Sequence, residues 1–345
     1  MARNNLKAFD IIKEAFTIFA KNTNFIIFTS LISLPLFCFS LYFEASLQEF
    51  LLQNSSILLQ AKDHETPEFH QLVDENSDFI VQYYYSYPES YGKSWSLPLD
   101  IVRKLSNDSL HKLLQLSFLY LVPFHLLELL TVLVIVDLAS KIYREDKSLT
   151  FNNIFDIKTD GTRLWGILVT YGYVVFFSTC TLLGFLTLLI TYSDIIRYFP
   201  YEYSDLFYYY MPFRSLDFDV FFHLVYGANF LLLLGIYLGW SAIWNLGLVI
   251  SVLKGTYGAK ALGSSAYLSL RSVQSGMILM LVFSIWGVGL RFPCLVYGCY
   301  KNWIWTVAQI SLFCFGNALK WVSFVVYFDD CIKRIFGKKV DVEEG

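Results

Sequence analysis

The sequence predicts an all-α integral membrane protein, a bundle of about six transmembrane helices with amphipathic helices at the membrane interface. Hydrophobic residues make up 56% of the 345 residues and charged residues only 16%, whereas a soluble domain is nearer one-quarter charged. Aromatic residues reach 19%. Apolar runs long enough to cross about 30 Å of hydrocarbon recur along the chain. Together these features identify the bilayer as the solvent.

The apolar runs predict six spans within a single membrane domain, residues 1–345. They lie at about 25–43, 113–138, 164–192, 220–253, 276–297 and 303–328. Residues 44–112 are the one long polar excursion and are expected to form an outer or lumenal loop. Pro35 is expected to kink the first span. The fourth span contains Gly235 and Gly239, a spacing that permits close approach of another helix.

Residues 6–20 predict an amphipathic helix before the first span. Apolar residues recur at spacings of three and four, with charged residues between them. The apolar set is Leu6, Phe9, Ile12, Phe16 and Phe19. Such a stripe suits the membrane interface or a groove in the protein's own bundle.

The distribution of positive charge predicts the orientation. Lys and Arg are more frequent on the side of the two termini, and an even number of spans puts both termini on that side. The positive-inside rule then makes both termini cytosolic, in an endomembrane such as the endoplasmic reticulum or in the plasma membrane. The sequons at Asn54 and Asn107 would face outside or a lumen, where they are candidates for N-glycosylation.

Composition also limits the partners. The net charge of −3 leaves no basic surface of the kind that binds nucleic acid. The six cysteines lie in or beside apolar runs without a CxxC or a Cys/His cluster, which is typical of small core residues. Cys331, close to Lys333 and Arg334 beyond the last span, is a candidate for S-acylation or a free cytosolic thiol. The first apolar run is not typical of a cleaved signal peptide.

One set of residues within the spans could carry chemistry. Glu128 lies within the second span, where a carboxylate is costly unless it is neutral, paired or in water. His125 lies one turn earlier on the same helix face, and Lys320 of the sixth span could reach the same layer. The set is either a proton or cation relay or a buried hydrogen-bonded pair that fixes helix packing. Lys320, which is expected towards the inner end of the sixth span, could instead snorkel to the headgroups.

No catalytic signature accompanies this set. The sequence contains no Gly-rich phosphate loop, GxSxG elbow, HExxH or paired-carboxylate pattern, so we expect no catalytic residue, no cofactor and no metal site. A metal site at His125 and Glu128 would need further ligands, and no other span offers them. The sequence favours a protein that is not an enzyme.

The most distinctive stretch of the sequence is Trp240–Ser272, where a long apolar helix is followed by a Gly-rich turn and an amphipathic run. It is predicted to face the cytosol between the fourth and fifth spans. Five of its residues are candidates for contact with a protein partner or anionic lipid. They are Lys254, Tyr257, Gly258, Lys260 and Arg271.

This stretch resembles a plant family of six-span membrane proteins, some of them labelled as polyadenylate-binding-protein interactors. The matching residues are Trp244–Gly247, Val249–Leu253, Tyr257–Gly258, Ala261 and Ser265–Leu268. The resemblance implies a six-span fold of no settled function. Asn245 stands where the family usually has His, and Lys254 where an acidic residue is common. A fainter similarity links the turn to the membrane region of some glycerophosphodiester phosphodiesterases and implies no catalytic residue.

Three functions fit these patterns. The first is a non-enzymatic scaffold, adaptor or membrane-organising factor that meets lipids and proteins at its cytosolic face. The second is a transporter or channel for a small solute, indicated by His125, Glu128, Lys320 and the Pro-broken spans. The third, a membrane-embedded lipid-modifying enzyme, has only the aromatic outer loops and scattered polar residues to support it.

Overall fold

The computed structural model describes residues 7–63, 107–145, 161–202, 215–270, 272–297 and 303–343. Every regular element in these ranges is helical, which confirms the predicted all-α class. The elements are α1 (Ala8–Lys21), α2 (Thr23–Asp63), α4 (Asn107–Leu119), the π-helix η2 (Tyr120–Phe124), α5 (His125–Glu145), α7 (Gly161–Glu202), α9 (Ser215–Lys254), α10 (Ala259–Ser269), α11 (Val273–Tyr297) and α12 (Trp303–Glu343).

Six of the described helical segments are long and apolar enough to cross a membrane, as the sequence predicts. These candidate spans are Thr23–Phe50, Asp108–Arg144, Gly161–Tyr192, His223–Lys254, Val273–Arg291 and Trp303–Ile335. The chain therefore has the composition and form of a multi-pass integral membrane protein.

The chain divides into two compact units. Unit 1 comprises Met1–Leu41 and Phe124–Gly345, and unit 2 comprises Tyr42–Pro123. The predicted outer loop, residues 44–112, is partly helical, because α2 runs on to Asp63 and α4 begins at Asn107. In unit 2, Lys112 of α4 lies 3.9 Å from the Glu49 carboxylate of α2. Residues 64–106 lie outside the described part of the chain.

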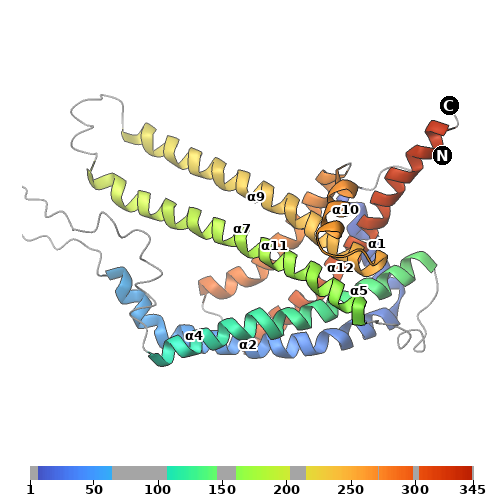
Figure 1. Cartoon of the computed structure of the whole chain (residues 1–345). Helices are drawn as coiled ribbons and strands as arrows, with labels where there is room; N and C mark the ends of the chain where they lie inside the picture. Colours follow the sequence, from blue (N-terminus) through green and yellow to red (C-terminus); the bar gives the residue numbers. More distant parts are fainter. Residues whose placement is uncertain are drawn as a thin grey trace, which may run out of the picture. The chain divides into compact units, whose positions relative to one another are not determined.

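The core of unit 1 is built on α9 and α12. Helix α9 packs against α7, α10 and α11, and α12 packs against α1, α5 and α11. Figure 1 shows α7 running beside α9 and the short α10 folded back next to the end of α9. The largest fully buried side chains of this core include Trp321, Tyr327 and Phe25.

The amphipathic helix α1 packs on the bundle through a different stripe from the one that the sequence suggests. Its buried side chains are Ala8, Ile11, Ala15, Ile18 and Phe19. Phe9 and Phe16 are 70% and 54% exposed, so these two members of the predicted stripe point away from the core. The apolar surface of α1 is wide enough to cover α12 and still leave a second apolar edge.

Candidate functional site

Three helices bring four polar side chains of unit 1 together, and we call this set the polar cluster. Its members are His125 and Glu128 of α5, Tyr171 of α7 and Lys320 of α12. Glu128 lies near the middle of the candidate span Asp108–Arg144, and Lys320 near the middle of Trp303–Ile335. The sequence placed Lys320 towards the inner end of its span. Its central position makes snorkelling to the headgroups harder.

Short hydrogen bonds join the cluster. The Tyr171 hydroxyl donates to Glu128 Oε2 over 2.8 Å, and the Tyr171 hydroxyl oxygen lies 2.8 Å from His125 Nδ1. His125 Nδ1 is also 3.4 Å from Glu128 Oε2, so the i, i+3 pair shares one helix face as predicted. The His125 and Glu128 side chains keep 18% and 23% of their surface exposed. The cluster is therefore packed and hydrogen-bonded, yet not sealed.

Lys320 supplies the opposite charge. It lies within electrostatic range of Glu128, and its Nζ is 4.5 Å from the centroid of the Trp321 ring. An ionised carboxylate in an apolar medium requires such a partner, because desolvation otherwise costs several kcal/mol. The arrangement can hold helices together, and it can also accept and release a proton.

Tyr171 is the member that the sequence did not reveal. It lies in an apolar run among other aromatic residues, and nothing in its spacing distinguishes it from exposed tyrosines such as Tyr173. In the structure Tyr171 is only 7% exposed, whereas Tyr173 is 43% exposed. Only the tertiary arrangement of α5 and α7 decides which of the two hydroxyls meets Glu128.

The second candidate region is the turn between α9 and α10, and its backbone is unusual at two glycines. Gly255 and Gly258 have φ of 65° and 63°, values that favour glycine. Gly166 of α7 lies directly under the Tyr257 ring, so a Cβ there would come within 2.3 Å of the ring. Tyr257 and Gly258, both predicted to contact a partner, therefore make contacts within the protein itself.

Side chains of α7 hold the same turn by hydrogen bonds. Thr170 Oγ1 accepts the Gly258 N–H at 2.7 Å and the Ser251 hydroxyl at 3.1 Å. Arg163 donates to the Val252 carbonyl in the last turn of α9, where carbonyl groups lack helical partners. Arg163 also lies 3.9 Å from the Asp137 carboxylate of α5. The turn within Trp240–Ser272 is therefore a structural joint between α7, α9 and α10.

The outer face of α10 is a separate surface. Lys260, Gly263, Ser264, Tyr267 and Leu270 are all exposed, at helical spacings of three and four. The opposite face is buried against α9. We call these five residues the α10 face.

The two remaining candidates of this region lie outside the α10 face. Lys254, also exposed, lies at the end of α9 with its Nζ 5.4 Å from the centroid of the Phe328 ring. Arg271, the last predicted contact residue, lies outside the described residues.

Cys331 does not have the accessible juxtamembrane position that an acylation site requires. It is 1% exposed, because α12 continues past the predicted end of the span at residue 328 and carries the thiol into the core. Its Sγ lies 3.1 Å from Ser272 Oγ, and Tyr327 donates to the Ser272 carbonyl. In this conformation the thiol fixes α12 to the start of α11, and no enzyme can reach it.

The two sequons lie at helical positions. Asn54 falls inside α2, and Asn107 is the first residue of α4. Towards the C-terminal end of α11, Arg291 remains exposed, with its guanidinium carbon 5.6 Å from the centroid of the Phe313 ring. This arrangement agrees with an anchoring role for Arg291 at the headgroups.

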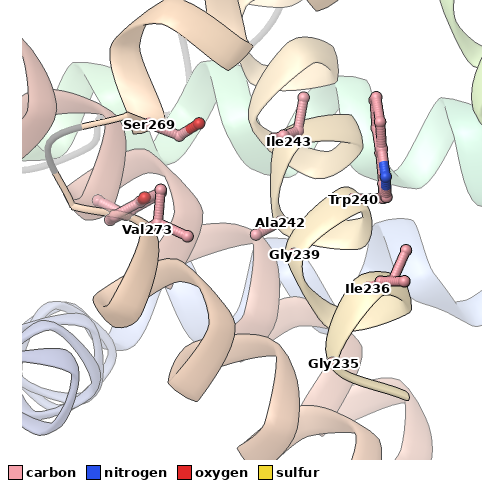
Figure 2. Close-up of a pocket in the computed structure, with 9 residues that line it drawn as sticks. Gly235, Ile236, Gly239, Trp240, Ala242, Ile243, Ser269 and Val273 are labelled. Carbon is pink, nitrogen blue, oxygen red and sulfur yellow. The ribbon is translucent and has the colours of Figure 1, made fainter. Parts of the chain in front are cut away.

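A cavity of about 230 Å³ lies beside α9, away from the polar cluster. Figure 2 shows it between α9 and the segment that carries Ser269 and Val273. A Cβ built on Gly235 or Gly239 would meet nothing within 4 Å, so no described helix of this chain uses their close-approach spacing. None of the four cluster residues lines this cavity.

Neither a protein-family model, nor a curated protein, nor a solved structure matches this chain. The resemblance to the plant six-span family therefore stays a prediction.

Proposed function

We propose that this protein is a non-enzymatic scaffold, adaptor or membrane-organising factor with both termini in the cytosol. The observation that supports it is that Trp240–Ser272 contains both residues that pack inside the protein and a separate exposed helix face. Tyr257 and Gly258 fix the joint, whereas the α10 face is left exposed. Lys260 with Tyr267 and Leu270 gives this face a cation and large apolar side chains, which suits an anionic membrane surface or a partner protein.

The test is proximity labelling from the C-terminus in intact membranes, with native mass spectrometry of bound lipids. Wild-type protein is expected to retain a defined set of proteins or anionic lipids. The triple variant Lys260→Glu, Tyr267→Ala, Leu270→Ala is expected to lose them. Its matched control is Leu231→Ala with Leu232→Ala, which removes side chains that are 66% and 64% exposed on α9. Equal recovery from wild type and the triple variant would contradict the proposal.

A second function, transport of a small solute, is favoured by the polar cluster. Ionisable residues within spans are costly, and they mark ion and substrate pathways and proton relays. Purified protein in vesicles would be tested with labelled inorganic ions and amino acids. Uptake by the wild type that is lost in Glu128→Gln supports transport, and absence of uptake for the whole panel, or uptake unchanged by Glu128→Gln, removes its main support.

A further inference from the structure

We infer that the polar cluster is a proton relay in which Tyr171 passes a proton from His125 to Glu128. This inference rests on the second function, transport, and specifies the ion that the cluster handles. It depends on the three hydrogen-bonding atoms that the structure brings together. These are His125 Nδ1, the Tyr171 hydroxyl oxygen and Glu128 Oε2.

The direction of the hydrogen bonds follows from counting protons. A phenol carries one O–H, and Tyr171 donates it to Glu128 Oε2 at 2.8 Å. The 2.8 Å contact between Tyr171 and His125 Nδ1 is then a hydrogen bond only if Nδ1 carries a proton and donates it. The cluster is a one-way chain of donors, from imidazole through phenol to carboxylate.

This chain allows one balanced step. The Nδ1 proton of a His125 imidazolium moves to the Tyr171 oxygen while the Tyr171 proton moves to Glu128 Oε2. The N–H bond at Nδ1 breaks and the phenol is regenerated. The products are a neutral imidazole protonated at Nε2 and a carboxylic acid. No electron is transferred and no co-reactant is consumed.

The groups around Glu128 suit a proton better than a metal cation. His125 faces it from α5, Tyr171 from α7 and Lys320 from α12, and no described charged group of α1 or α9 acts on it. Among the described residues no third His, Cys or carboxylate joins His125 and Glu128. A proton needs only the single oxygen that Tyr171 already contacts.

Infrared difference spectroscopy of the purified protein in nanodiscs tests the relay directly. Lowering the pH is expected to produce a carboxylic acid C=O band that is absent in Glu128→Gln. In Tyr171→Phe this band should shift, because the acid loses its hydrogen-bond partner. The matched control, Tyr173→Phe on the exposed face of α7, should leave it in place. A band that survives Glu128→Gln, or that is unmoved by Tyr171→Phe, overturns the relay.

Proton flux into vesicles that contain a pH-sensitive dye gives the second readout. Tyr171→Phe is expected to slow flux at least ~10-fold, while Tyr173→Phe stays near the wild-type rate. Equal flux in the two variants overturns the relay. The relay and the transport function can fail separately. If solute uptake depends on Glu128 but the carboxylic acid band does not, the transport function stands and only the relay is overturned. A Glu128 band without any proton flux would overturn transfer through Tyr171.

Discussion

At the scale of residues, the polar cluster shows how one neutral side chain organises several ionisable ones. Tyr171 contacts both His125 and Glu128, and Lys320 balances the carboxylate from a third helix. Each member is acceptable in the apolar interior because the others are present. Removing one member should therefore disturb the rest.

Glu128 and Lys320 are expected to be energetically coupled. Lys320→Met leaves an uncompensated carboxylate and should lower the free energy of unfolding by about 1–3 kcal/mol. Adding Glu128→Gln should recover part of that loss, because the charge left without a partner is then removed. Thermal unfolding in detergent compares the stability of the wild type, the two single variants and the double variant. Strictly additive losses would show that the two residues do not interact.

At the scale of elements, the joint of α7, α9 and α10 depends on glycines with different roles. Gly258 has φ 63° and ψ −139°, a backbone conformation that residues other than glycine strongly disfavour. Gly166 provides space, since the Tyr257 ring occupies the position of its missing side chain. The two roles can be tested separately.

Gly258→Ala is expected to destabilise the protein by about 1–3 kcal/mol, because alanine cannot adopt this conformation without strain. Gly263→Ala is the control in the neighbouring helix α10, where an added Cβ meets nothing within 4 Å. It should leave stability unchanged or raise it by up to about 1 kcal/mol through helix propensity. Thermal melting followed by size-exclusion chromatography compares them. A Gly258→Ala variant as stable as Gly263→Ala would contradict the role given to the turn.

Gly166→Ala is expected to force the Tyr257 ring from its position and to cost about 1–3 kcal/mol by overpacking. Gly172→Ala on the same helix is its control, because nothing lies within 4 Å of the added Cβ. Limited proteolysis at the α9–α10 turn would register the displaced ring. Equal cleavage rates for the two variants would show that Tyr257 does not depend on Gly166.

At the scale of the whole molecule, six candidate spans are expected to put both termini on one side of the membrane. Epitope tags at the two ends should be accessible to antibody after selective permeabilisation of the plasma membrane. A tag inserted between residues 64 and 106 should be on the opposite side: protected until the internal membranes are opened in an endomembrane, or accessible on intact cells in the plasma membrane. Termini found on opposite sides would show that one of the six helices does not cross.

The sequence by itself determined the helical class, the six apolar spans and the helix-face pairing of His125 with Glu128. Those properties follow from composition and from periodicity along a single helix, and both are local. The sequence did not determine that Tyr171 joins the cluster, that Tyr257 packs on Gly166, or that Cys331 is buried. Each of these pairs atoms from helices far apart in the chain. An apolar helix can present any side to its neighbours in a bilayer, so only tertiary packing selects the polar groups that meet.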